Sequence, residues 1–243
     1  MSKLLASRAV RVLTVMAAAA AGLAVSGTAH AAVFGTHFFN EHFHGHQFSG
    51  GNWGGYVSFG SFTTATASWT EPSVSCTSTN DLFAPWVGID GDGSSTVEQT
   101  GVATDCSSGH PVYQAWYEMY PAAPVYYSTS SAPVAAGDKI SATVTRTGTN
   151  TYRLDISDTT KGWTKTITKS LTSKHASAEA IIESPTDSYP SISGGISFTG
   201  VKFNGTNLAS TSPSALNADD RGTNTWIPGA IGSDGQSFTI SRH

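Results

Sequence analysis

Charged side chains are scarce in this sequence. Only 12% of the 243 residues are Asp, Glu, Lys or Arg, and the formal net charge is −4. A chain without a basic excess lacks the electrostatic footprint of a nucleic-acid-binding protein. With 39% hydrophobic and 10% aromatic residues, the chain is nevertheless apolar enough to bury a sizeable core. We therefore expect a folded protein that has no nucleic-acid partner.

Helical patterns are missing beyond the first 31 residues. No segment rich in Ala, Leu, Glu and Lys keeps a helical period for three turns, whereas 25 Gly and many Ser and Thr separate short β-prone segments. A chain of this length fits one β domain. The fold class predicted is all-β, with two antiparallel sheets packed as a sandwich. The strands are expected at Tyr56–Phe59, Phe62–Thr70, Phe83–Asp90, Thr96–Val102, Val112–Tyr120, Lys139–Thr145, Thr151–Ser157, Trp163–Thr168, Ala178–Glu183, Gly200–Phe203 and Ser237–Ser241.

Long hydrophobic runs are absent except near the N-terminus. There, basic residues precede the apolar run Val12–Val25, and Ala29-His30-Ala31 gives the small-x-small pattern that a signal peptidase reads. The run is shorter than the roughly 20 residues needed to cross a bilayer. We expect residues 1–31 to be a signal peptide and the protein to be secreted to the extracellular space, with no membrane attachment once the leader is removed.

The segment after the leader differs in composition from the rest of the chain. Residues 32–51 are rich in His, Gly and Phe and include His42-Phe43-His44-Gly45-His46. Alternating histidines could hold a metal ion, but no Cys or second cluster accompanies them. We therefore predict no metal site, an N-terminal tail or short pro-segment at residues 32–51, and one folded domain at residues 52–243.

Lys and Arg are absent between Arg11 and Lys139, although nine carboxylates lie in that stretch. Without nearby cations, carboxyl groups that folding desolvates or crowds should have raised pKa values. This expectation suits a protein that works in acid. The alternative is that later lysines, such as Lys161, Lys165 and Lys169, reach these carboxylates across the sandwich. The carboxylates are Glu41, Glu71, Asp81, Asp90, Asp92, Glu98, Asp105, Glu118 and Asp138.

Cysteine occurs only twice, at Cys76 and Cys106. In an exported protein an even number of cysteines favours a disulfide between them. A thiol peptidase built on Cys106 and His110 is the alternative, but a spacing of four residues is no signature of one.

The motifs of several large hydrolase classes are also missing. The chain has no Gly-x-Ser-x-Gly or Gly-Asp-Ser-Gly run, no Asp-Thr-Gly or Asp-Ser-Gly, and no His-Glu-x-x-His. Serine, pepsin-like and zinc peptidases therefore have no support. What the chain does contain is polar and aromatic residues at strand spacing. One face of each strand is expected to carry them and to form a peptide or sugar groove: Gln114, Trp116, Glu118 and Tyr120; Trp86, Gly88 and Asp90; Glu179, Ile181 and Glu183.

Seven segments that carry these residues resemble, in order, the glutamic peptidases, also called eqolisins. The resemblance implies a concanavalin A-like, jelly-roll type of sandwich and an acid endopeptidase without metal or organic cofactor, whose partners are polypeptide substrates. We expect a monomer. The segments are Asn52-Trp53-Gly54-Gly55, Thr66-Ala67-Ser68-Trp69-Thr70-Glu71-Pro72, Trp86-Val87-Gly88-Ile89-Asp90-Gly91, Gln99-Thr100-Gly101, Ala115-Trp116-Tyr117-Glu118-Met119-Tyr120-Pro121, Gly137-Asp138 and Ala178-Glu179-Ala180-Ile181-Ile182-Glu183.

The resemblance also assigns roles to single residues. The catalytic glutamine of the family falls on Gln99 and its catalytic glutamate on Glu183. The expected substrate-binding residues are Trp53, Trp86, Asp90, Gln114, Glu118 and Tyr120, with Gln114 standing where an acid is common in the family.

One departure from the family is Glu98, which replaces an apolar residue and should point away from Gln99 into solvent. Two other functions stay open: a carbohydrate-binding module, and a glycoside hydrolase that pairs Glu98 or Glu118 with Glu183.

Overall fold

The computed structural model describes residues 48–243, and these residues form strands with one short 3-10 helix, η1 (Leu208–Ser210). The predicted signal peptide and nearly all of the predicted tail lie outside the described residues. The predicted strands are confirmed, with ends that differ by a few residues. The described residues contain no helix with the length and hydropathy of a membrane span.

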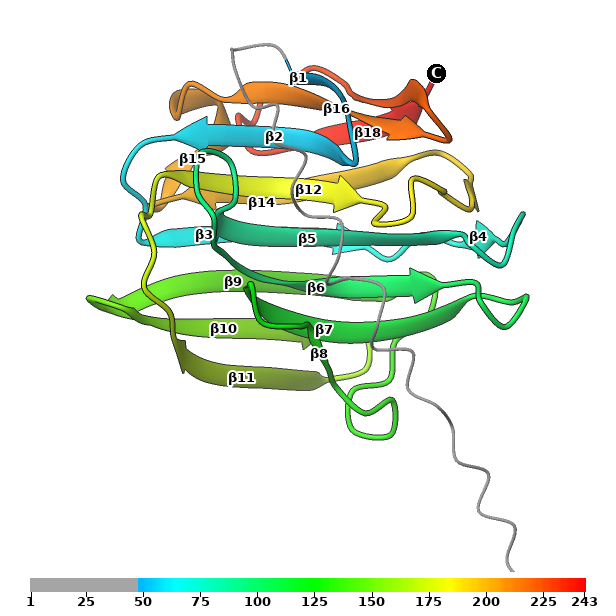
Figure 1. Ribbon diagram of the computed structural model, residues 1–243, viewed down its shortest axis with the longest axis horizontal. Helices are drawn as coiled ribbons and strands as arrows, with labels where there is room; N and C mark the ends of the chain where they lie inside the picture. The colour runs from blue at the N-terminus through cyan, green and yellow to red at the C-terminus, as the bar shows by residue number, and fades with distance from the viewer. Residues whose placement is uncertain (1–47) are drawn as a thin grey trace, which may run out of the picture. The chain divides into compact units, whose positions relative to one another are not determined.

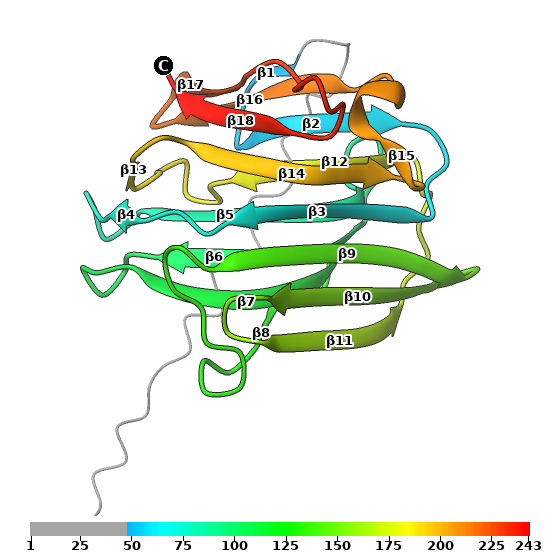
Figure 2. The ribbon, with the colours of Figure 1, turned by 180° about the vertical axis from the view of Figure 1, so that it is seen from behind.

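The strands lie in two layers, which Figures 1 and 2 show from opposite sides. One layer contains β1 (Phe48–Gly51), β16 (Ser214–Asp220), β2 (Trp53–Phe59), β12 (Ser177–Glu183), β5 (Leu82–Asp90), β6 (Val97–Asp105), β7 (Val112–Tyr120) and β8 (Val125–Tyr126). The other contains β11 (Trp163–Ser170), β10 (Thr151–Asp158), β9 (Lys139–Gly148), β3 (Thr64–Thr70), β14 (Ile196–Phe203), β15 (Thr206–Asn207), β18 (Phe238–Arg242) and β17 (Thr223–Pro228). A separate pair is formed by β4 (Val74–Ser75) and β13 (Ser191–Ile192).

The two layers are one hydrogen-bonded sheet folded over on itself. The β16–β17 hairpin continues the ladder from one layer to the other, and every pair except β1 with β16 is antiparallel. The sequence predicts two packed antiparallel sheets from the number of short strands, and the structure links the two layers through this hairpin. Strand β1 places Phe48–Gly51 in the sheet, so the ladder begins four residues before the predicted boundary at residue 52.

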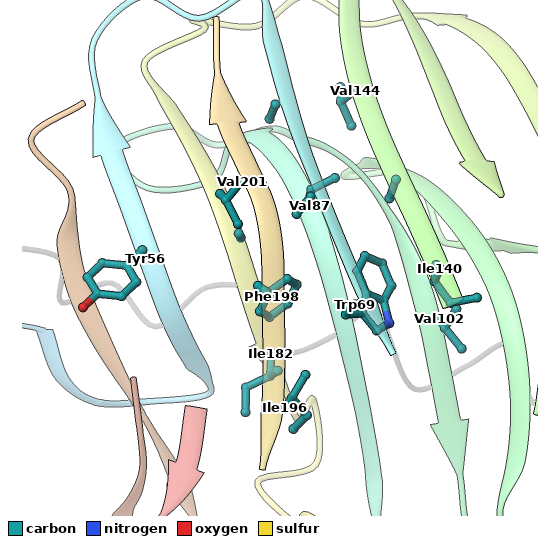
Figure 3. Packing of buried hydrophobic residues seen from close by; sticks show 14 of the residues in the cluster. Tyr56, Trp69, Val87, Val102, Ile140, Val144, Ile182, Ile196, Phe198 and Val201 are labelled. Carbon is teal, nitrogen blue, oxygen red and sulfur yellow. The ribbon is translucent and has the colours of Figure 1, made fainter. Parts of the chain in front are cut away.

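The main core lies between the layers (Figure 3). Strand alternation sends Val87 and Ile182 of one layer inward, where they meet Trp69, Ile140 and Phe198 of the other. Burying side chains of this size contributes about 1.5–3 kcal/mol each. The core therefore fixes which face of β5, β6, β7 and β12 points outward.

Candidate active site

Strand register brings the three predicted functional faces together. Strands β12, β5, β6 and β7 are neighbours in that order (Figure 1). In one row Glu179 pairs with Gly88, Gly88 with Gln99, and Gln99 with Glu118. All four belong to the face of the layer that points away from the main core, which we call the site face. The site face has an apolar cluster of its own, which includes Val57, Ala84, Trp86, Trp116 and Ile181.

Gln99 and Glu118 form a direct hydrogen bond at the centre of the site face. Gln99 Nε2 donates to Glu118 Oε2 at 2.7 Å, and both side chains are 0% exposed. The amide oxygen of Gln99, Oε1, and the second carboxyl oxygen of Glu118, Oε1, have no hydrogen-bond partner within the described residues. Burial raises the pKa of Glu118 to about 8, although the bond from Gln99 acts in the opposite direction. Glu118 therefore holds a proton throughout the acid range while the face is closed to solvent.

Glu183 ends β12 on the same face. It pairs with Ala84 and Trp53, four residues along β12 from the Glu179 row. Burial raises its pKa well above the usual value, and the charge of Glu118 raises it further. Glu183 and Glu118 are therefore close enough for their charges to interact. Since Glu118 also accepts the hydrogen bond from Gln99, it links the two predicted catalytic residues, Gln99 and Glu183.

Three donors counteract the rise in the pKa of Glu183. Asn52 Nδ2 donates to Glu183 Oε1 at 2.8 Å. The indoles of Trp53 and Trp86 also favour the ionised carboxyl, although Trp86 Nε1 has no direct hydrogen-bond partner among the described residues. These donors offset part of the rise, but the pKa of Glu183 stays well above its usual value.

The two tryptophans pack against each other and against two glycine residues. The rings of Trp53 and Trp86 meet edge to face with centroids 4.9 Å apart. A Cβ at Gly88 would lie 2.8 Å from Trp86 Cζ3, and one at Gly91 would lie 2.6 Å from Trp53 Cη2. Glycine at these positions therefore allows the indoles to lie directly against the chain.

The remaining predicted substrate-binding residues are Asp90, Gln114 and Tyr120, and the hydrogen bonds of Asp90 and Gln114 lead to groups other than Gln99 and Glu183. Asp90 is buried, and its two carboxylate oxygens accept the backbone N–H groups of His175 and Ala176 at 2.8 and 2.7 Å. This carboxylate anchors the segment before β12, so any contact it makes with substrate stays a prediction. Gln114 donates to the Tyr127 carbonyl at 3.0 Å, and Tyr120 is half-buried at the end of β7.

Comparison with known proteins places this geometry in a family. Residues 51–231 match the model of the Peptidase A4 family. The chain belongs to this family. Aspergillopepsin-2 of Aspergillus niger is 33% identical over 138 residues, which are 48% of this chain and 48% of the relative. Scytalidopepsin B of Scytalidium lignicola is 36% identical over 140 residues, 54% of this chain and 51% of the relative. The alignments thus span about half the length of these curated relatives.

Solved structures of A4-type peptidases share the fold. The crystal structure of scytalido-glutamic peptidase with a transition state analog inhibitor has a TM-score of 0.68 at 26% identity, covering 79% of this chain and 98% of that chain. The eqolisin SCP-B, in a complex with the tripeptide Ala-Ile-His, has a TM-score of 0.63 at 25% identity with the same coverage. Aspergilloglutamic peptidase from Aspergillus niger has a TM-score of 0.54 at 26% identity and covers 67% of this chain and 99% of that chain. The predicted family and the all-β sandwich are confirmed.

The A4 fold corrects one expectation from the sequence. Glu98 does point away from Gln99, but it is 0% exposed, because that side of β6 faces the other layer and not solvent. Its strand partners Ile89 and Met119 both belong to the main core. Glu98 and Glu183 therefore lie on opposite faces of the layer, and a glycoside hydrolase that pairs them is excluded.

The cysteine prediction is confirmed in this A4 chain. Cys76 and Cys106 form a disulfide with Cα atoms 5.6 Å apart, which removes the thiol alternative. Within residues 48–243 no group of three or more His, Cys, Asp or Glu is placed to hold a metal ion.

Sequence reasoning assigns no role to Asn52 or Trp116. Asn52 directly precedes Trp53 in a segment that matched the family, and this position was the signal for its role. Trp116 was placed on the functional face of its strand but was given no role; it pairs with Gly101 in the row beside Gln99.

Proposed function

We propose that this protein is an acid endopeptidase that cleaves peptide bonds with a water molecule activated by Glu183 and oriented by Gln99. The observation that supports this most strongly is the linked group of Gln99, Glu118 and Glu183 on one face, joined by a hydrogen bond and by mutual charge. Family membership supports the same reaction class.

Glu183 acts first as a base and then as an acid. Its carboxylate takes a proton from water while the water oxygen attacks the peptide carbonyl carbon; the same proton then passes to the amide nitrogen as the C–N bond breaks. Burial and mutual repulsion disfavour two negative charges on Glu118 and Glu183, so the pair shares one proton. The productive form has Glu183 ionised and Glu118 protonated, so the pair carries one negative charge and one proton.

Gln99 supplies polarity without charge. Its amide has two N–H donors and a carbonyl acceptor, and the bond to Glu118 uses one donor. The remaining N–H stabilises the oxyanion that develops on the substrate, and Oε1 accepts a hydrogen bond from the attacking water and so orients it. Trp53 and Trp86 form the apolar wall against which the peptide is held in attack geometry.

The test is cleavage of an unfolded protein by the leaderless protein at pH near 4. Gln99→Ala and Glu183→Gln should each lower kcat by at least ~100-fold while leaving the fold intact, since the loss of one oxyanion donor alone costs this much. Glu179→Gln is the matched control, because Glu179 lies on the same strand and face. Near-normal kcat in Glu183→Gln, or no cleavage by the parent protein, would contradict the assignment; a carbohydrate-binding module cleaves nothing.

We also propose that the protein is secreted and that residues 1–31 are removed on export, as the leader pattern supports. N-terminal sequencing of the exported protein should begin at Ala32 or, if residues 32–51 are a pro-segment that is removed, near Asn52. The domain of residues 52–243 is proposed to act as a monomer, which sedimentation at pH 4 tests.

A further inference from the structure

A second group of polar residues lies between the layers, behind the site face. Glu98 of β6 is 0% exposed, and neither of its carboxyl oxygens has a hydrogen-bond partner within the described residues. Strands β6 and β10 pack across the interior at this point. A buried acid without a partner is costly and calls for an explanation.

The segment between β11 and β12 closes over this acid. Tyr152 of β10 and Ser173 share a hydroxyl–hydroxyl hydrogen bond, and the Tyr152 ring stacks on His175 with centroids 5.9 Å apart. His175 has a φ of 60°, and its Nε2 is buried with no partner among the described residues. Asp90 holds the same segment through the N–H groups of His175 and Ala176. We call Asp90, Glu98, Tyr152, Ser173 and His175 the interlayer cluster.

We propose that the interlayer cluster is a pH-sensitive latch, in which protonated Glu98 lets residues 171–176 close over the cluster with His175 buried, and ionised Glu98 releases them. The latch stands on the contacts of the cluster and does not depend on the proposed peptidase activity. It would nevertheless act close to the site, because Glu98 directly precedes Gln99 and the released segment leads into β12.

The charges around Glu98 set the direction of the switch. Burial and then the charge of Asp90 raise the pKa of Glu98 to about 8, and the Ser173 hydroxyl acts weakly against this. The titratable groups that face it are Asp90 from β5, Tyr152 from β10 and His175 from the segment. The segment also carries Lys174, whose Nζ donates to the Gly93 carbonyl at 3.2 Å. The neighbouring side chains on β5 and β7, Ile89 and Met119, are apolar.

No cation compensates an ionised Glu98. Among the described residues neither Lys nor Arg forms an ion pair with it. Arg146 of β9 influences Tyr152, but its guanidinium group donates to the carbonyls of Gly148 and Thr149. An ionised Glu98 would therefore lie near Asp90 without a counter-charge, and opening of residues 171–176 to water is the nearest relief.

Hydrogen exchange of the folded protein at pH 5 and pH 8 tests the latch. In the Glu183→Gln protein, which cannot digest itself, protection factors of residues 173–176 should fall by at least ~10-fold between the two pH values, and by less in the core strands β3 and β14. Adding Glu98→Gln, which is neutral at both pH values, should remove most of this fall. Adding Glu71→Gln is the matched control, because Glu71 is also buried with a pKa near 8 but lies outside the cluster; the fall should persist.

Equal protection at pH 5 and pH 8 would refute the latch. A fall that is uniform across the chain, or that Glu98→Gln leaves unchanged, would also refute it. Should Glu98→Gln fail to fold, Ser173→Ala provides the second test. Without its hydroxyl, residues 173–176 should already be less protected at pH 5, and unchanged protection there would overturn the proposal. Since the readout is exchange and not cleavage, a failed peptidase assignment leaves this result interpretable.

Discussion

Raising the pH from 4.5 to 8 should destabilise this protein, because three buried glutamates hold protons that the unfolded chain would release. Burial is the largest cause of the raised pKa of Glu71, Glu98 and Glu118, each from 4.5 to about 8. In this interval the native state binds more protons than the unfolded state. The stabilisation is therefore fully present below pH 4.5 and is lost as the pH rises through 8.

The magnitude follows from the size of these shifts. A pKa that rises from 4.5 to about 8 corresponds to at most about 5 kcal/mol per group. For three groups this ceiling approaches the whole free energy of unfolding of a typical domain, about 5–15 kcal/mol. Local opening lets water reach some of these carboxyls before the whole chain unfolds, so we expect a loss of at least about 3 kcal/mol between pH 5 and pH 8.

Two other acids act in the opposite direction at lower pH. Burial alone would raise the pKa of Asp81, but hydrogen bonds from Thr77 and Ser188 outweigh it and the pKa is lowered. The pKa of Asp138 is lowered as well, because the bond from Lys161 and the Ala135 N–H outweigh burial. Their contribution is present above the ordinary Asp value of 3.8 and is lost as pH falls further. Stability should therefore be greatest near pH 4–5.

Urea unfolding of the Glu183→Gln protein from pH 3 to pH 8 measures this dependence. A midpoint that stays level or rises from pH 5 to pH 8 would refute the reasoning, because it would mean that these glutamates are already ionised and paired in the native state. The m-value should stay constant across the range, which separates a change in stability from a change in the unfolded state.

Two further predictions concern the disulfide and the proposed base. Replacing Cys76 and Cys106 by alanine should lower the free energy of unfolding by about 3–4 kcal/mol, because the bond closes a loop with a sequence separation of 30; a urea midpoint within 10% of the parent would contradict this. Asn52→Ala removes a donor that favours the ionised form of Glu183, so the rise of kcat on the acid side of its pH profile should move to higher pH. The control Asn80→Ala changes an exposed residue and should leave the profile in place. An unchanged profile in Asn52→Ala would show that this contact does not set the pKa of the base.

Period-two alternation was sufficient to predict which side chains share a face of one strand. On β7 it separates Glu118 and Trp116 from Tyr117 and Met119, and burial in two different clusters bears this out. Alternation says nothing about register. The pairing of Gln99 with Glu118 depends on how β6 slides against β7, and the sequence offers no local signal for that.

Besides four strands of two residues each within the described part of the chain, the sequence did not predict β1, β16 and β17. Strand β16 reads Ser-Ala-Leu-Asn-Ala-Asp-Asp and has no run of β-branched or aromatic residues. Strand β17 does contain such a run, Thr225-Trp226-Ile227, but it is short and ends at Pro228. Their strand conformation comes from the ladder that links the two layers. Strand β1 ends in glycines and is held in the same way. In β1 and β16, tertiary pairing overrides weak propensity.

The stretch between Arg11 and Lys139 lacks Lys and Arg, and the sequence left two outcomes open for its carboxylates: raised pKa values, or pairing with cations from later in the chain. The structure shows both. Among the described residues, cations from later in the chain form ion pairs with two carboxylates of this stretch: Arg221 pairs with Asp81 at 2.9 Å and Lys161 with Asp138 at 2.8 Å. Glu98 and Glu118, on the two faces of β6 and β7, have no ion pair among the described residues and have raised pKa values. Lys or Arg within β5–β7 would stabilise these carboxylates as anions and abolish the shared proton that the proposed mechanism needs at low pH. On the proposed mechanism, the absence of basic residues keeps this proton on the site face, and the loss of stability expected at neutral pH has the same cause, the burial of carboxyl groups without a cation.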